Sequence, residues 1–291
     1  MSQDHSGFVL RIIAVAMMVA MSACIHAAAK VLPLGQVMFW RSGIALIAIL
    51  AYMLWCRDLP GALFTKRPLG HVTRGAFGAF SMLCSFASLA YLPVATAQAL
   101  AYLAPILTLP LAAWSLGEKI SSRAVIAVSF GMAGVITILW RALHLPGTGA
   151  WIGAAAGLGY AVTMAFVRVH IKALTKTESP ATISFYFAVI CTVIGLASYP
   201  LGWGEVSADL IWPLLGAGIL GGLGHIVSAE AVARSSVGNL AVYDYTGIIW
   251  ALLFDLVLFG TVPGVWSIIG MALILFAALL PFMTKGVARR T

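Results

Sequence analysis

The chain has 291 residues, of which 62% are hydrophobic and 9% are charged, and its mean hydropathy is +1.03. This composition excludes a soluble globular protein and predicts a membrane protein. The net charge of +8 could indicate nucleic-acid binding, but the basic residues are spread over short connections between apolar segments. We therefore expect membrane lipid and a small molecule as partners, and no nucleic acid.

Ten apolar segments follow one another along the chain. A bilayer core about 30 Å thick needs roughly 20 apolar residues for each helix that crosses it. These segments are continuously apolar, whereas the strands of a membrane barrel alternate over about 10 residues. Helices are expected, because a helix satisfies its own backbone hydrogen bonds in lipid. The predicted spans lie near residues 9–29, 37–55, 70–90, 96–116, 124–140, 149–168, 180–200, 211–232, 238–259 and 264–284.

The distribution of lysine and arginine predicts the orientation. If the N-terminus is cytoplasmic, only Lys30, Arg41 and Arg141 of the 17 basic residues fall on the outer side. Cytoplasmic connections of membrane proteins carry such an excess of positive charge. We therefore predict that both termini are cytoplasmic in a multi-pass protein of the bacterial inner (plasma) membrane. The cytoplasmic group would be Arg11, Arg57, Lys66, Arg67, Arg74, Lys119, Arg123, Arg168, Lys172, Lys176, Arg234, Lys285, Arg289 and Arg290.

The cysteines do not indicate a metal centre. Cys24, Cys56, Cys84 and Cys191 are scattered and form no CxxC pair. They are expected to be small core residues, with no disulfide, metal or cofactor. The residues before Cys24 loosely resemble a lipoprotein cleavage box, but the apolar run continues to Ala29, so we expect a retained helix.

Polar residues of the second and third spans are the first that could face a cavity. Arg41 lies one turn inside the second span, and we interpret it as an interfacial anchor or, alternatively, as a positive charge at the outer mouth. In the third span Ser81, Ser85 and Ser88 share one helical face. Ser85 is therefore a candidate for substrate binding.

The fourth span carries a second polar face. Gln98, Tyr102 and Pro105 recur at helical spacing, and Pro105 removes a backbone hydrogen bond within the span. Such breaks are tolerated where a neighbouring helix or a water-filled cavity satisfies the freed carbonyl group. We predict that Gln98 and Tyr102 line a solute path.

The second half repeats this arrangement with more glycine. Tyr160 follows a glycine-rich stretch in the sixth span, and His225 and Ser228 share a face of the eighth. The ninth span carries Tyr243, Asp244, Tyr245 and Trp250, and tyrosine and tryptophan offer an apolar ring with a polar tip that could also hold an ammonium group. The predicted substrate-binding set is Ser85, Gln98, Tyr102, Tyr160, His225, Ser228, Tyr243, Asp244, Tyr245 and Trp250.

Several of these side chains have a structural alternative. Ionisable groups within a span indicate function by default, but Glu230 could pair with Arg234 one turn later. Asp244 could act at a site or gate, or could make a structural hydrogen bond. Asp255 is expected at the interface. Aromatic residues are often interfacial anchors. Four of them lie deeper in their spans than an anchor requires, namely Tyr102, Tyr243, Tyr245 and Trp250.

An internal duplication organises these features. At an offset of 143 residues, Gly75, Gly78, Ser85, Tyr102 and Gly117 meet identical residue types without a gap. The predicted units are residues 1–143 and 144–291, each with five helices. Because five is odd, the two units would be inverted relative to each other, with a site near the midplane between them.

The same residues resemble the EamA-type, ten-helix members of the drug/metabolite transporter (DMT) superfamily. The resemblance implies an all-α membrane fold of two inverted repeats and transport by alternating access. Within the superfamily, the chain looks most like YddG-type amino-acid exporters, which implies export of aromatic and other neutral amino acids. The residues that carry the resemblance are 39–41 (FWR), 74–75 (RG), 90–100 (AYLPVATAQAL), Tyr102, Pro105, 117–119 (GEK), Gly131 and Gly134.

Other functions remain as alternatives. The chain has no HExxH, GxSxG or phosphate-binding loop, so we expect no catalytic residues and no enzyme. A proton-coupled exporter of drugs or organic cations is the rival interpretation, in which Asp244 or Glu230 would carry the proton. A phosphate-bearing substrate would need several buried basic residues, which the spans are not expected to supply. The sequence gives no oligomerisation face, and a monomer is expected.

Overall fold

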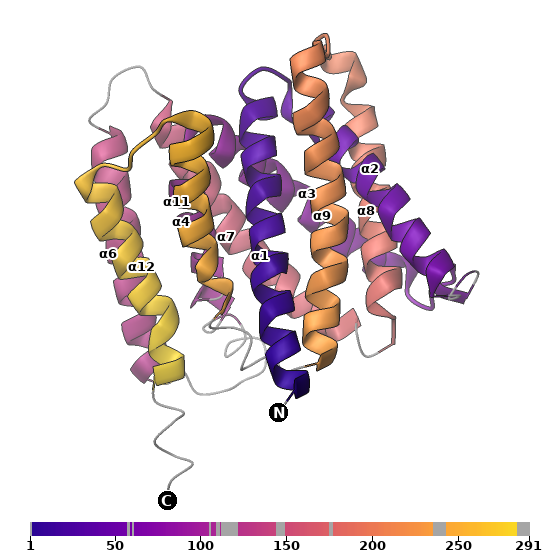
Figure 1. The fold of residues 1–291 in the computed structure, drawn as a ribbon, viewed down its shortest axis with the longest axis horizontal. Coiled ribbons are helices and arrows are strands. Elements are labelled where there is room, and N and C mark those ends of the chain that lie inside the picture. The colour runs from indigo at the N-terminus through magenta and orange to yellow at the C-terminus, as the bar shows by residue number, and fades with distance from the viewer. Residues whose placement is uncertain are drawn as a thin grey trace, which may run out of the picture.

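Each of the ten predicted spans contains an α-helix among its described residues in the computed structural model of the protein (Figure 1). The structure describes residues 2–56, 59, 61–104, 106–108, 111, 122–143, 149–174, 177–234 and 243–283. The first half contains α1 (Ser2–Ala29), α2 (Leu34–Trp55), α3 (Pro68–Tyr91), α4 (Val94–Ala101) and α6 (Ser122–Leu143). The second half contains α7 (Ala150–Leu174), α8 (Pro180–Ala197), α9 (Ala208–Arg234), α11 (Thr246–Phe259) and α12 (Val265–Met283). No strand occurs among these residues, which confirms the all-helical prediction.

The helices run side by side in one bundle, each roughly antiparallel to the next along the chain (Figure 1). α1 begins and α12 ends at the same end of the bundle, which we call the terminal end. Six helices are long and apolar enough to cross a membrane by length and composition, and α11 and α12 are shorter apolar helices. The sequence and the fold together describe a multi-pass membrane protein.

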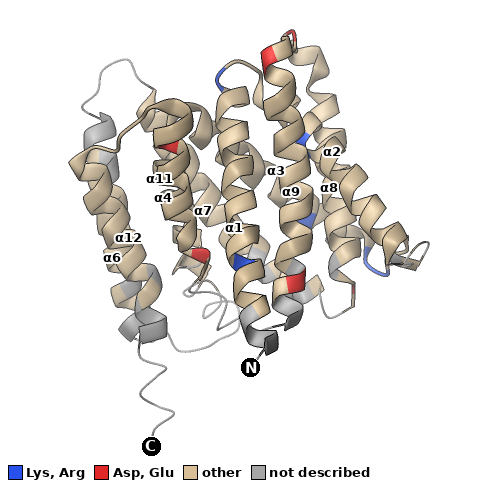
Figure 2. Cartoon of the chain, in the orientation of Figure 1, with Lys and Arg blue, Asp and Glu red and all other residues tan. Residues whose placement is uncertain are grey.

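Large apolar side chains cover the outside of the bundle. Trp55 is 87% exposed, and Ile47, Ile249 and Val257 are each exposed by about two thirds. A soluble protein would bury a large share of such residues. Figure 2 shows most charged residues near the two ends of the bundle, with basic residues also at intermediate height. The apolar surface between the ends therefore has the character expected of a face in contact with lipid tails.

Small residues bring the helices close together inside the bundle. α1 packs along α9, α3 along α7, α2 along α8 and α6 along α12. A Cβ atom added at Gly195 of α8 would lie 2.6 Å from the Phe39 backbone nitrogen of α2. Small residues at helix interfaces allow this approach in lipid, where packing replaces the hydrophobic effect as the driving force.

Local signals set several helix ends. α8 begins at Pro180, and the hydroxyl of Ser179 before it accepts a hydrogen bond from the Thr182 backbone nitrogen at 3.1 Å. This is the usual arrangement of an N-cap followed by proline. α11 ends at Phe259, and Gly260 after it has a φ of 61°, a conformation that glycine adopts without steric cost.

Asp255 lies in the last two turns of α11, near a helix end as expected, but its side chain is turned into the bundle. It is 1% exposed, and its two carboxylate oxygens accept hydrogen bonds from the backbone nitrogens of Val94 and Ala95 at 2.9 and 2.7 Å. These nitrogens begin α4 and have no partner within their own helix. A negative charge is favourable at that position of the helix dipole. Pro105 and residues 117–119, which carried part of the resemblance, lie outside the described residues.

Candidate functional site

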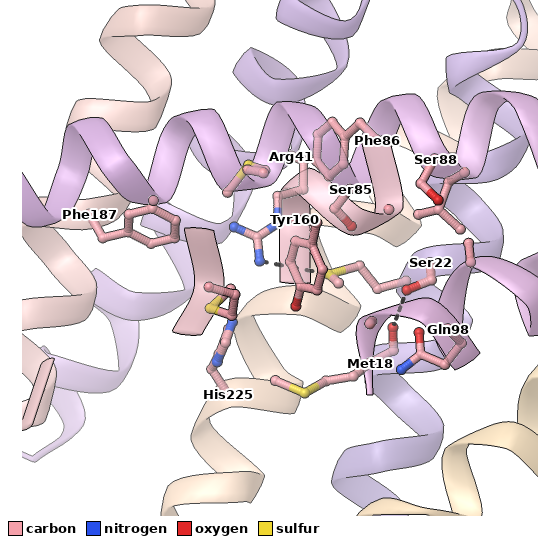
Figure 3. A pocket seen from close by; sticks show the side chains of 18 of the residues that line it. Met18, Ser22, Arg41, Ser85, Phe86, Ser88, Gln98, Tyr160, Phe187 and His225 are labelled. Carbon is pink, nitrogen blue, oxygen red and sulfur yellow. Dashed lines mark hydrogen bonds between the residues drawn. The ribbon is translucent and has the colours of Figure 1, made fainter. Parts of the chain in front are cut away.

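A cavity of about 250 Å³ lies inside the bundle. Its walls come from α1, α2, α3 and α4 of the first half and from α7, α8 and α9 of the second. Figure 3 shows Arg41, Tyr160 and His225 converging on this space from three helices. Ser22, Ser88 and Gln98 lie together in one part of the wall, and Phe187 lies in another.

Four residues of the predicted set line the cavity. These are Ser85, Gln98, Tyr160 and His225. They lie on α3, α4, α7 and α9, so helices far apart in the sequence present them to one space. Tyrosine, serine, glutamine and histidine side chains can donate and accept hydrogen bonds, and they could orient a small polar solute.

Arg41 also lines the cavity, which the interpretation of this residue as an interfacial anchor did not foresee. Its side chain is 6% exposed, and its Nε atom is buried without a hydrogen-bond partner. Its Nη2 donates to the Met21 sulfur at 3.7 Å, which is a weak acceptor. The guanidinium group therefore points into the protein, although Arg41 lies only two turns from the start of α2.

Arg74 is a second guanidinium group in the same cavity. The sequence places it with the cytoplasmic basic residues, but its Nε and Nη1 atoms are buried and unpartnered. Its guanidinium carbon lies 4.0 Å from the centre of the Phe187 ring, in a cation–π arrangement. Both arginines interact electrostatically with His225 and Cys191, so the two charges lie near one another. The expectation that the spans hold almost no cavity-facing basic residue is wrong.

Two glycines make room for these guanidinium groups. A Cβ atom at Gly78 would lie 2.2 Å from Arg74 Nη1, and one at Gly221 would lie 3.3 Å from Arg41 Nη2. The two glycines occupy equivalent positions at the 143-residue offset. The duplicated glycines are therefore the sequence signal that could have identified the arginines, since each leaves space beside a charged group.

The cavity has an excess of positive charge. Arg41 and Arg74 also line a smaller adjoining cavity of about 220 Å³, together with Ser184, Phe187 and His225. No aspartate or glutamate is found among the described residues that line either space. Within the described part of the chain, no group of three or more metal-binding side chains occurs either.

The rest of the predicted set is absent from the described lining of the cavity, and much of it gathers at the terminal end of the bundle. The Arg11 Nε atom lies 2.5 Å from an Asp244 carboxylate oxygen, and Arg11 also donates to the Ser228 hydroxyl. The Tyr102 hydroxyl donates to the Asp244 backbone oxygen at 2.6 Å. We call Arg11, Tyr102, Ser228 and Asp244 the terminal cluster. It links α1, α4, α9 and the residues before α11.

Aromatic rings extend this cluster. The rings of Tyr102 and Tyr245 lie 5.3 Å apart, and Tyr243 stacks on Phe8 of α1 at 5.1 Å. Trp250 packs against the apolar core. These residues therefore fill space between helices at the terminal end. Glu230, for which a partner on the next turn was the alternative, accepts a hydrogen bond from the Tyr52 hydroxyl at 3.4 Å.

A further polar cluster joins the connections before α3 and before α8 at the terminal end, together with His71 of α3. Glu178 accepts hydrogen bonds from the Lys66 backbone nitrogen at 3.0 Å and from the Thr65 hydroxyl at 3.2 Å. The second carboxylate oxygen of Glu178 lies 3.7 Å from the Nε2 atom of His71. Burial acts to raise the pKa of Glu178, but these hydrogen bonds and His71 outweigh it, and the pKa lies below its ordinary value.

Comparison with known proteins places this architecture among transporters. The model of the EamA-like transporter family matches residues 5–140 and again residues 151–283. The chain is 29% identical to the pseudopaline exporter CntI of Pseudomonas aeruginosa over 96% of this chain and 97% of that protein. It is 27% identical to a riboflavin transporter of Rhizobium johnstonii, over 89% and 83% of the two chains. A solved crystal structure with 21% identity has the same fold, with a TM-score of 0.66 over 98% of both chains. The chain therefore belongs to the EamA-like transporter family of the DMT superfamily, and it is a membrane transporter of small molecules rather than an enzyme.

Proposed function

We propose that this protein exports small metabolites of amino-acid-like chemistry from a bacterial cell by alternating access. The observation that carries the proposal is a cavity walled by helices of both halves of the chain. A site between two repeats can be exposed to one side of the membrane and then to the other when one repeat rocks against the other. A cavity within only one half would not have this property.

The helix pairings support the inverted arrangement of the halves. α1 and α3 are the first and third helices of one half, and α7 and α9 are those of the other. A two-fold axis that relates the halves would map α1 onto α7 and α9 onto α3. It would therefore map the contact of α1 with α9 onto the contact of α7 with α3, and both of these pairs pack extensively. The family model also matches each half separately. With five helices in each half, both termini would lie in the cytoplasm, in agreement with the positive-inside distribution.

The size and lining of the cavity support an amino-acid-like solute. Pockets for drug-sized ligands measure roughly 300 to 1,000 Å³, and this cavity of about 250 Å³ is smaller. Phe86, Phe187 and Tyr160 offer rings, while Ser85 and Gln98 offer hydrogen bonds. Aromatic and other neutral amino acids, the class implied by the YddG-type resemblance, are the first substrates to test.

The terminal cluster fits the role of a gate. An ion pair and a tyrosine hydrogen bond connect four segments at the end that we assign to the cytoplasm. Arg11 and Asp244 are partly exposed, with 21% and 35% of their side-chain surfaces accessible, so water can reach the pair and replace its contacts. Separation of these groups would open a path from the cytoplasm to the cavity.

The charge of the cavity disfavours the rival interpretation. A drug or cation exporter coupled to protons needs a carboxylate that takes up either the proton or the cation. Among the described residues of the lining there is none, and two guanidinium groups would repel a cation there. Asp244, the candidate proton carrier, is paired with Arg11 in the terminal cluster.

Counterflow of labelled phenylalanine and threonine into proteoliposomes, with and without a pH gradient, tests the proposal. We expect saturable exchange of at least one amino acid that needs no pH gradient and that falls about tenfold or more in Tyr160→Ala, because cavity contacts position the solute. Tyr199→Ala is the matched control, since Tyr199 is 63% exposed at the opposite end of the bundle. Exchange of cationic dyes against protons, without exchange of any amino acid, would refute the proposal.

A further inference from the structure

The two arginines in the cavity are charged groups, and no aspartate or glutamate lies beside them among the described residues that line it. Arg41 is almost fully buried, and nitrogen atoms of both guanidinium groups have neither solvent contact nor a hydrogen-bond partner. A buried charge costs several kcal/mol unless it is paired and hydrogen-bonded. A sequence under selection for stability alone would not keep two such groups in the lining of one cavity, so the pair indicates a missing anionic partner.

The surroundings of the pair are built for such a partner. Gly78 and Gly221 leave room for the two guanidinium groups, and the Phe187 ring supports Arg74 from one side. Guanidinium groups are rigid donors that match carboxylate oxygens in a bidentate geometry. They enter the cavity from different helices, α2 and α3, which suits two separate acidic groups on one solute.

Neutral amino acids leave this site incompletely balanced. A zwitterion brings one carboxylate for two guanidinium groups, and its ammonium group finds no carboxylate among the described residues of the lining. A solute with two carboxylates neutralises both arginines and leaves the neighbouring Ser85, Gln98 and Tyr160 to bind its other polar groups.

We propose that Arg41 and Arg74 form a binding site for a small dicarboxylate that carries two negative charges and no ammonium group, such as succinate. This inference rests on the proposed function only in taking the cavity to be the solute site. It changes the expected substrate from a neutral amino acid to a dicarboxylate of similar size. It assigns to Arg41 and Arg74 the role of substrate-binding residues.

The test is a binding measurement on the purified full-length protein in detergent, which does not depend on transport. Succinate, succinamate and succinamide have nearly the same shape and carry two, one and no negative charges. We expect thermal stabilisation and calorimetric affinity to fall in that order at constant ionic strength. Equal responses to the three compounds would overturn the proposal, and so would tighter binding of inorganic phosphate than of succinate, because phosphate is a single compact anion.

Five variants locate the effect. Arg41→Gln and Arg74→Gln should each weaken succinate binding by about tenfold to hundredfold, the loss typical of a charged hydrogen bond. Arg67→Gln is the matched control, since Arg67 is an exposed arginine one residue before α3 begins, and it should bind succinate normally. Arg41→Lys and Arg74→Lys keep the positive charge but lose the planar guanidinium group that donates two parallel hydrogen bonds. These variants should bind succinate with intermediate affinity. Unchanged binding in both glutamine variants would overturn the proposal.

The stability of the ligand-free protein gives a second, independent readout. If the arginines await an anion, Arg41→Gln removes an uncompensated charge and should raise the unfolding temperature without ligand while it weakens succinate binding. If Arg41 had a purely structural role, its substitution would lower both the unfolding temperature without ligand and the affinity for succinate. That result would overturn the proposal. Binding of succinate without any amino-acid exchange in proteoliposomes would retain the acid site and refute the proposed transport function, so the two failures can be told apart.

Discussion

At the scale of single residues, charges inside this bundle serve two different purposes. Asp255 is fully satisfied, because its carboxylate accepts two backbone hydrogen bonds at the start of α4. In contrast, Arg41 Nε and Arg74 Nε and Nη1 are buried without a hydrogen-bond partner among the described residues. Buried polar groups in native proteins are nearly always hydrogen-bonded, so the contrast separates a structural charge from a charge that serves binding.

Asp255→Ala should destabilise the protein by about 2 to 4 kcal/mol, because it leaves two backbone nitrogens at a helix start without an acceptor. Asp255→Asn keeps one acceptor and should cost less. Unfolding of the purified protein in detergent, followed by circular dichroism, measures the difference. Glu205→Ala is the control, since Glu205 is exposed in the loop before α9. A loss in Asp255→Ala no larger than in this control would contradict the helix-capping role.

At the scale of elements, close helix contacts depend on particular glycines. Gly43 and Gly195 both lie between α2 and α8, but they differ in the space around them. A Cβ atom at Gly195 would meet the Phe39 backbone at 2.6 Å, whereas one at Gly43 would meet only the Thr192 methyl group at 3.8 Å. Backbone atoms cannot move aside as a side chain can.

Gly195→Ala should therefore push α2 and α8 apart and cost about 1 to 3 kcal/mol, as overpacking does. Gly43→Ala should be neutral or stabilising by up to about 1 kcal/mol, because alanine favours the helix over glycine. The measurement is the unfolding free energy of both variants in the same detergent. Equal effects of the two substitutions would show that the helix approach at Gly195 has been overstated.

The Glu178 cluster joins the connection before α3 to the start of α8, and its strength should depend on pH. The pKa of Glu178 in the folded protein lies below its ordinary value of 4.5. Because the carboxyl group has a lower pKa in the folded protein than in the unfolded chain, it stabilises the fold at a pH above its unfolded-state pKa. This stabilisation is lost as the pH falls through its folded-state pKa. The unfolding temperature of Glu178→Gln should lie below that of the unchanged protein at pH 7, and the gap should close below about pH 4.5. A gap that stays constant down to pH 3 would contradict this assignment.

At the scale of the whole molecule, the two ends of the bundle should face different compartments. Cys56 is exposed at the end of α2, at the terminal end, and Glu205 is exposed in the loop at the opposite end. In a background without other cysteines, a membrane-impermeant maleimide added to intact cells should label Glu205→Cys and leave Cys56 unlabelled. The reverse pattern would place the termini outside the cytoplasm.

Much of the fold could be predicted from the sequence, because continuous apolar segments in lipid can form only helices. The positions of Arg74 and Asp255 could not be predicted in this way. Both residues lie near the ends of spans, where a charged side chain commonly extends to the membrane interface. Whether such a side chain points into the bundle instead depends on the neighbouring helices, which the sequence does not reveal. Helical spacing singled out Ser85, Gln98 and His225, which line the cavity, and Tyr160 was chosen because it follows a glycine-rich stretch. The ion pair of Arg11 with Asp244, in contrast, joins residues 233 positions apart, which spacing along one helix cannot reveal.

The excess positive charge of the cavity also bears on the energy source for export. Living bacterial cells maintain a membrane potential that is negative inside, and each elementary charge that crosses it gains or loses about 2.3 kcal/mol per 100 mV. A doubly negative acid that leaves the cytoplasm would gain about twice this amount. Two fixed guanidinium groups that accept such an acid would therefore let the electrical gradient itself drive efflux, with no ion moving inward in exchange.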